Sequence, residues 1–184
     1  MTSPTSISIP KLRADVSGRV IGPDDAEYDR ARAVFYGGFD LYPAVIVQVA
    51  DEVDIARVIA LARETGLELA VKSGGHSVIG QGVSDGGIVI DLAGLRAIDV
   101  DAEERTAWAQ TGLTALEFTT ATHAHGLGVG FGDTGSVGIG GITLGPPLFT
   151  ASSRPVSRAS AIARAMSTSS ATRTITAGYR SNPP

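Results

Sequence analysis

The chain has 184 residues, a net charge of −4 at pH 7, 43% hydrophobic residues and no cysteine. This length suits one domain or a small two-lobed one, and the acidic balance gives no support to nucleic-acid binding. The lack of cysteine excludes disulfides, thiolate metal sites and a cysteine nucleophile. Residues 1–10 lack the basic and apolar regions of a secretory signal, and no stretch is as long as a membrane span. We therefore expect a cytoplasmic protein with no membrane partner.

The segment before the first predicted strand carries weak signals. Residues 1–10 are polar and contain two prolines, which predicts a loose end. Residues 11–20 are compatible with a short helix or a turn. The charged run over residues 29–32 is expected to be solvated.

A strand–helix–strand unit follows. Residues 42–49 are rich in β-branched side chains after a proline, which predicts a strand. Asp51 can cap the next helix, acidic residues in its first turn suit the helix dipole, and Gly66 ends it. Residues 67–71 form a second strand, and the short links predict that the two strands are parallel. One face of the helix is marked at helical spacing by Val53, Ala56, Ile59, Ala60 and Arg63.

Two adjacent glycines, Gly74 and Gly75, follow the second strand, and His76 comes next. Paired glycines let backbone N–H groups turn toward one point and let a ligand approach the main chain. With the hydroxyls of Ser73 and Ser77, the loop could cradle a phosphate or pyrophosphate beside a reactive imidazole. The alternative is a tight turn with a surface histidine, because Gly-Gly marks turns more often than ligand sites. This segment alone leaves both interpretations open.

A third strand is predicted over residues 87–92, after the glycine loop. Residues 95–100 and 105–110 then predict a small antiparallel pair around a polar turn. The tetrapeptide 114–117 has the spacing of a capping box and predicts a helix through Thr122. Two histidines at the end of this helix stand two positions apart and point in different directions, so we expect no metal site there.

A second glycine-rich stretch covers residues 126–145, and eight of its first sixteen residues are glycine. So many glycines cost considerable backbone entropy on folding. A chain tolerates that cost where its backbone must lie against a bulky ligand. The stretch is therefore predicted to line a ligand.

The composition changes abruptly at Pro146. Ser, Thr, Ala, Arg and Pro make up 30 of the last 39 residues, and no Asp or Glu follows Asp133. The first 145 residues carry a charge of −9, whereas the tail holds five arginines. Residues 157–166 could form a weak helix, and most of the tail is predicted to be disordered or loosely attached.

Three motifs occur in a fixed order. They read Val71-Lys72-Ser73-Gly74-Gly75-His76-Ser77, then Gly87-Ile88-Val89-Ile90-Asp91-Leu92, then Gly132-Asp133-Thr134-Gly135-Ser136-Val137-Gly138-Ile139-Gly140-Gly141-Ile142-Thr143-Leu144-Gly145. In this order and spacing they resemble the FAD-binding domain of the FAD-linked oxidases. The nearest branch is the berberine-bridge-enzyme-like group within the vanillyl-alcohol-oxidase family. A dinucleotide-binding Rossmann fingerprint competes, but the glycines do not lie in a strand–GxGxxG–helix unit.

The resemblance implies an α+β fold of the PCMH type, with FAD in the cleft between two lobes. The first lobe would hold the βαβ unit, and the second would be partial. Residues 1–32 are then an N-terminal extension, 33–145 an incomplete FAD-binding domain and 146–184 a low-complexity tail. Relatives continue past this point with further FAD contacts and a substrate domain, so we expect that the natural reading frame is lost near Pro146.

The resemblance also implies a set of cofactor contacts. In the family, the Ser-Gly-Gly-His loop wraps the FAD pyrophosphate through backbone amides and often bonds through its histidine to the 8α-methyl carbon of the flavin. The histidine maps to His76, for which a non-covalent polar contact is the alternative. Relatives with a second link use a cysteine where this chain has Thr134, so only a single link is available. The loop positions map to Ser73, Gly74, Gly75, His76, Ser77, Gly80, Gln81 and Gly82.

Further contacts with FAD are implied beyond this loop. Asp91 and Leu92 would end a strand near the cofactor, although Asp91 is equally compatible with a turn or cap role. Thr111 and Gly112 occupy a position where relatives place another FAD contact. The ring and the ribityl chain would be lined by Gly132, Thr134, Ser136, Val137, Gly138, Gly140, Gly141 and Leu144.

The implied function is the FAD-binding part of an FAD-dependent oxidoreductase. A small-molecule substrate would pass a hydride to flavin N5, and dioxygen would usually reoxidise the flavin. The substrate pocket and the catalytic base would lie in the missing domain, so no catalytic residue is identified, and whether this chain is itself an enzyme stays open. The alternatives are a truncated fragment that binds FAD weakly or not at all, and an unrelated glycine-rich α/β binding module.

Overall fold

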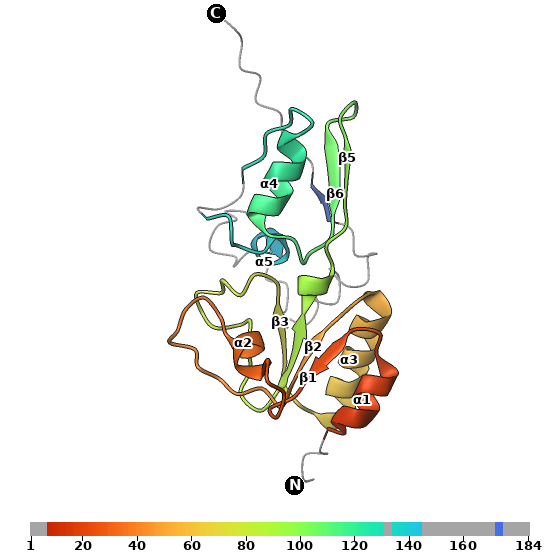
Figure 1. Ribbon diagram of the computed structural model, residues 1–184, viewed down its shortest axis with the longest axis vertical. Coiled ribbons are helices and arrows are strands. Elements are labelled where there is room, and N and C mark those ends of the chain that lie inside the picture. Colours follow the sequence, from red (N-terminus) through yellow and green to blue (C-terminus); the bar gives the residue numbers. More distant parts are fainter. Residues whose placement is uncertain (1–6, 131–133, 145–171, 175–184) are drawn as a thin grey trace, which may run out of the picture.

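The computed structural model describes residues 7–130, 134–144 and 172–174. They form two lobes (Figure 1). The first lobe contains helices α1–α3 and a four-stranded sheet, and the second contains α4, α5 and a three-stranded sheet. This is the two-lobed α+β arrangement predicted from the sequence. Within these residues, no helix is long and apolar enough to cross a membrane.

The first lobe is built around the predicted βαβ unit. Strands β2 and β3 both pair in parallel with β4, which lies between them, and β1 pairs antiparallel with β2. All four residues of β4 are buried, as expected for a central parallel strand that is covered on both faces. The elements are α1 (Ile9–Asp15), β1 (Arg19–Ile21), α2 (Tyr28–Arg32), β2 (Val45–Gln48), α3 (Glu52–Thr65), β3 (Leu69–Lys72), β4 (Ile88–Asp91) and the 3₁₀ helix η1 (Leu92–Gly94).

Alternate residues of the central strands pack on opposite faces of this sheet, which follows from the twofold period of a strand. Val45 and Ile88 face α1 and α3, which bury Leu12 and Val58 against them. Ile46 and Val89 face the other side, where Tyr28 of α2 and the partly buried segment after it cover them. Figure 1 shows the sheet between these two groups of helices.

The face of α3 that the helical spacing marked in the sequence is not the buried face. Val53 is 54% exposed, and Ala56, Ala60 and Arg63 are exposed as well, while Ile59 is only partly buried. The buried positions are Asp54, Ile55, Val58, Ala62 and Thr65. Asp54 takes an inward position because its carboxylate accepts hydrogen bonds from the amides of Ser17, Gly18 and Ala50, at 2.8, 2.8 and 3.1 Å. Hydrophobic spacing could not identify a charged residue as buried.

The N-terminal segment also differs from the prediction. Helix α1 begins at Ile9, two residues before the predicted range, and Pro10 is tolerated in its first turn. Strand β1 was not predicted. Residues 29–32 belong to α2 and are not all solvated, because the Arg32 side chain is only 13% exposed and forms ion pairs with Asp29 and Asp40.

The second lobe contains the predicted antiparallel pair and the predicted capped helix. Both halves of the capping box between Thr114 and Glu117 are present. The sequence did not predict α5, which lies inside the glycine-rich stretch, or β7, which pairs antiparallel with β6. The predicted helix over residues 157–166 lies outside the described residues. The elements are β5 (Ile98–Asp101), β6 (Thr106–Ala109), α4 (Ala115–His123), α5 (Ile139–Leu144) and β7 (Thr172–Thr174).

We expect Asp54→Asn to lower the free energy of unfolding by about 2–3 kcal/mol, because an amide nitrogen would face backbone donors at a fully buried position. Urea unfolding at pH 7 measures this difference. Glu64→Gln, on the exposed face of the same helix, is the matched control and should leave the stability unchanged.

The stabilisation by Asp54 should also depend on pH. Burial raises the pKa of the Asp54 carboxyl. Hydrogen bonds from the amides of Ser17, Ala50 and Gly18 together lower it by more than burial raises it, so its pKa lies below the ordinary value. The carboxylate then contributes its full stability above the unfolded pKa of about 4 and loses it as the pH falls through the folded pKa. The stability difference between wild type and Asp54→Asn should shrink below about pH 4. An equal difference at pH 7 and at pH 3 would contradict this role.

Candidate functional site

The loop that follows β3 lies at the junction of the two lobes. The Ser73 hydroxyl donates a hydrogen bond to the Thr111 carbonyl oxygen at 2.6 Å, which ties the first lobe to the second. Figure 1 shows α5 on the side of the second lobe that faces β3. The two glycine motifs, distant in sequence, are therefore brought together here.

Three glycines of these motifs pack directly against protein. A Cβ atom added at Gly74 would overlap the backbone nitrogen of Gly138, and one added at Gly138 would overlap the nitrogen of Gly74. A Cβ at Gly140 would lie 2.9 Å from the Thr111 carbonyl oxygen. The close approach of two backbone segments therefore requires glycine at these three positions, and their contact with a ligand stays a prediction.

Other glycines of the first loop shape its turn. Gly75 has a φ of +72°, a conformation that favours glycine, and an added Cβ would be in ordinary contact with Val34 at 3.7 Å. Gly82 is in similar contact with Lys72 at 3.8 Å, and both glycines are buried. Gly80 also has a positive φ, of +71°, and packs against the ring of Phe39. The glycines therefore set the backbone conformation of the loop.

The backbone amides of this loop form a row of available donors. Among the described residues, none of the amides of residues 74–79 donates a hydrogen bond to another group. The turn that follows is closed instead by the Gly80 amide on the Ser77 carbonyl at 3.2 Å and by the Gln81 amide on the Ser77 hydroxyl at 3.0 Å. Consecutive amides around a left-handed residue form a concave donor site for anions, which suits phosphate oxygens.

His76 stacks on an aromatic side chain that the sequence analysis did not identify. The imidazole is half-buried, and its centroid lies 4.2 Å from that of the Phe35 ring, with 22° between the ring planes. The Phe35 amide donates to the Gly75 carbonyl oxygen at 3.0 Å. Within the described part of the chain, neither ring nitrogen of His76 takes part in a hydrogen bond. The nitrogen-bearing edge of the ring is therefore available for chemistry.

A buried ion pair supports the base of the loop. Lys72 Nζ lies 3.5 Å from Asp91 Oδ2, with side-chain exposures of 12% and 8%, and Lys72 also donates to the Ala31 carbonyl oxygen. Asp91 caps η1 by accepting from the Ala93 amide at 2.9 Å, which agrees with the cap role left open by the sequence. Leu92 is part of the core beneath. The sequence analysis missed Lys72, although it is the last strand residue before the glycine loop.

The remaining predicted contact residues are spread around this junction. Gly112 packs against the carbonyl oxygens of Leu92 and Leu95. The hydroxyls of Thr134 and Ser136 lie 3.2 Å apart and are exposed. The structure brings together at the junction Ser73, Gly74, Thr111, Ser136, Gly138 and Gly140.

Four further predicted residues have no described contact with the glycine loop. Val137 is half-buried, and its carbonyl oxygen accepts from the Ala115 amide at 2.8 Å. Gly141 is exposed, with no atom near its added Cβ. Leu144 ends α5. Gly132 lies outside the described residues.

Comparison with known proteins gives matches over most of the described chain. The FAD binding domain family matches residues 43–146. The uncharacterised FAD-linked oxidoreductase YvdP of Bacillus subtilis is 36% identical over 131 residues, which cover 71% of this chain and 29% of the relative. The chain therefore spans less than a third of the length of this relative.

Two solved structures have a similar fold. The 6-hydroxy-D-nicotine oxidase of Arthrobacter nicotinovorans superposes with a TM-score of 0.65 and 31% identity, over 67% of this chain and 27% of that one. The xylooligosaccharide oxidase of Myceliophthora thermophila C1 gives a TM-score of 0.67 and 26% identity, over 75% of this chain and 30% of that one.

We expect Gly138→Ala to destabilise the junction by about 1–3 kcal/mol, because the new methyl group would overlap the backbone of Gly74. Thermal unfolding followed by circular dichroism measures the loss. Gly141→Ala, three residues later in α5, is the matched control, since it would meet no atom within 4 Å. Equal melting temperatures for the two variants would show that the two glycine motifs do not pack as described.

Proposed function

The chain belongs to the FAD binding domain family of the FAD-linked oxidoreductases, with FAD as its cofactor, and from this premise we propose that the loop over residues 73–79 holds the FAD pyrophosphate. The support is the row of backbone amides at residues 74–79, which have no acceptor among the described residues. The positive φ of Gly75 gives this row the left-handed residue that concave anion sites contain. The residues at the junction therefore fit the cofactor.

His76 is the residue for covalent attachment in this proposal. Its ring nitrogen would form a bond to the 8α carbon of the flavin, while that carbon and the imidazole each release one proton. Attachment would also release two electrons, and dioxygen would accept them with two protons to give hydrogen peroxide. Imidazole is a suitable nucleophile because its neutral form is well populated near neutral pH. With no cysteine in the chain, this single link is the available one.

The proposed activity is that of an FAD-dependent oxidase. When bound, FAD would accept a hydride at N5 from a small-molecule substrate, and dioxygen would reoxidise it. The chain's own residues bind and orient the cofactor: the loop amides hold its phosphates, Ser73 fixes the loop to Thr111, and Lys72 and Asp91 support the base of the loop. Two solved relatives are oxidases by name, which supports this reaction class. A cytoplasmic location stays a prediction from the sequence.

The test is flavin retention by the full 184-residue chain. We expect that the chain, incubated with FAD in air, separated from unbound FAD by gel filtration and then precipitated with acid, gives a yellow pellet with a flavin absorption spectrum. His76→Ala should move that absorbance to the supernatant, because the nucleophilic nitrogen is lost while the amide row remains. His123→Ala, at the exposed end of α4, is the matched control and should keep the colour in the pellet.

Two other outcomes separate the alternatives. Flavin in the supernatant of the wild-type protein would mean non-covalent binding and would contradict the role of His76. Absence of flavin from both fractions would contradict the proposed cofactor site and favour a non-binding fragment.

A further inference from the structure

Phe35 is held beside His76 by its backbone rather than by a core. Its side chain is 62% exposed, so burial of the ring does not explain its position. The Phe35 amide is hydrogen-bonded to Gly75, the residue immediately before His76, at 3.0 Å. Tyr36 contacts the outer side of the Phe35 ring edge-on, with centroids 5.1 Å apart and an interplanar angle of 85°.

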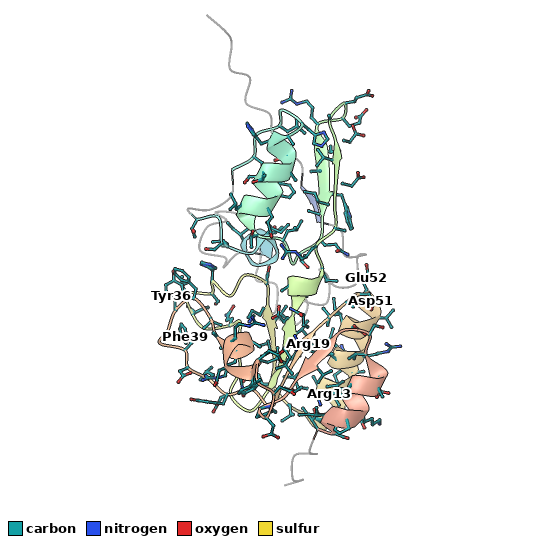
Figure 2. All side chains as sticks on the ribbon, viewed as in Figure 1. Arg13, Arg19, Tyr36, Phe39, Asp51 and Glu52 are labelled. Carbon is teal, nitrogen blue, oxygen red and sulfur yellow. The ribbon has the colours of Figure 1, made fainter. Side chains whose placement is uncertain are left out.

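The segment that carries Phe35 is anchored on both sides. Before it, Arg32 forms ion pairs with Asp29 and Asp40, and its guanidinium lies 4.1 Å from the centroid of the Tyr42 ring. After it, Phe39 packs against Gly80 at the far end of the glycine loop. Figure 2 shows Tyr36 and Phe39 on one side of the first lobe, opposite Asp51 and Glu52. The Phe35 ring is therefore positioned by the protein before any cofactor binds.

Stacking of this kind restricts the imidazole without blocking its nitrogens. A histidine ring has a broad torsional preference about its last side-chain bond, and a parallel aromatic neighbour narrows it. The lone pair that forms a new bond lies in the plane of the imidazole, at the edge of the ring. A neighbour that covers one face leaves that edge free, and neither nitrogen has a hydrogen-bond partner among the described residues.

We propose that Phe35 is a positioning residue for His76, which holds the imidazole plane so that covalent attachment of FAD proceeds at its full rate. The inference rests on the proposed role of His76 and adds a residue 41 positions earlier in the chain. Phe35 takes no part in bond making. Its contribution is orientation, since a reacting atom held near its attack geometry reacts faster than one that samples many orientations.

The test compares Phe35→Leu, which keeps an apolar side chain but loses the ring, with the wild type. The apo chain is mixed with saturating FAD in air, samples are quenched with acid, and flavin in the pellet is followed with time. We expect the first-order rate of attachment to fall about three- to tenfold, the range that corresponds to one lost aromatic contact. The FAD concentration that gives half the maximal rate should be unchanged. Phe35→Tyr should restore the wild-type rate.

Tyr36→Leu is the matched control, because Tyr36 is aromatic and adjacent but does not stack on His76. Its attachment rate should equal that of the wild type. A second measurement needs no cofactor: the ring protons of His76, assigned with His76→Ala, should show an upfield NMR shift in the apo wild type. This shift should disappear in Phe35→Leu and persist in Tyr36→Leu.

Each unfavourable outcome is distinguishable. An unchanged attachment rate in Phe35→Leu, or the absence of the ring-current shift in the wild type, overturns the positioning role alone. A rise in the half-saturating FAD concentration with no change in maximal rate also overturns it, since Phe35 would then be a contact for FAD itself. If the wild type acquires no covalent flavin, the role of His76 fails and the positioning role fails with it.

Discussion

The close contact between the backbones of Gly74 and Gly138 is the constraint on which the junction of the two lobes depends. Neither residue has room for a side chain, because each would collide with the backbone nitrogen of the other. Ser73 adds a hydrogen bond to the Thr111 carbonyl oxygen in the same place. The first loop therefore takes its shape from the second lobe as well as from β3, and a site at this junction requires both lobes to be folded.

This contact divides the glycines into two groups with different tasks. Gly74, Gly138 and Gly140 allow two segments of main chain to approach each other, whereas Gly75 and Gly80 give the loop its positive φ angles. With the first group holding the loop in place, the amides of residues 74–79 are left without internal acceptors. A rigid row of unpaired donors is what an anionic group of a cofactor needs, since little entropy is then lost on binding.

The chain matches the FAD-binding part of longer proteins. It spans 29% of the length of the FAD-linked oxidoreductase YvdP and 27% of the nicotine oxidase structure. The described residues contain a four-stranded sheet, a glycine loop supported by the Lys72–Asp91 ion pair, and a half-buried imidazole. In the proposed function, these features bind and orient the flavin.

Local signals in the sequence determined much of this protein. The β-branched runs, the capping residue Asp51, the terminating Gly66 and the capping box at Thr114 act within a few residues, and each is present in the structure. The three ordered motifs were sufficient to identify the family and the cofactor. The sequence also located His76 in the loop between the parallel strands, although not the residue that stacks on it.

The tertiary structure decided the features that depend on partners distant in sequence. Asp54 is buried because its amide donors come from residues 36 and 37 positions earlier, so the apolar pattern of α3 indicated the wrong face. Gly74 and Gly138 meet across the lobes, which is a packing requirement for glycine that the sequence did not reveal. Phe35 reaches His76 through the backbone of Gly75. Such contacts depend on how the lobes pack, and no spacing within a single element encodes them.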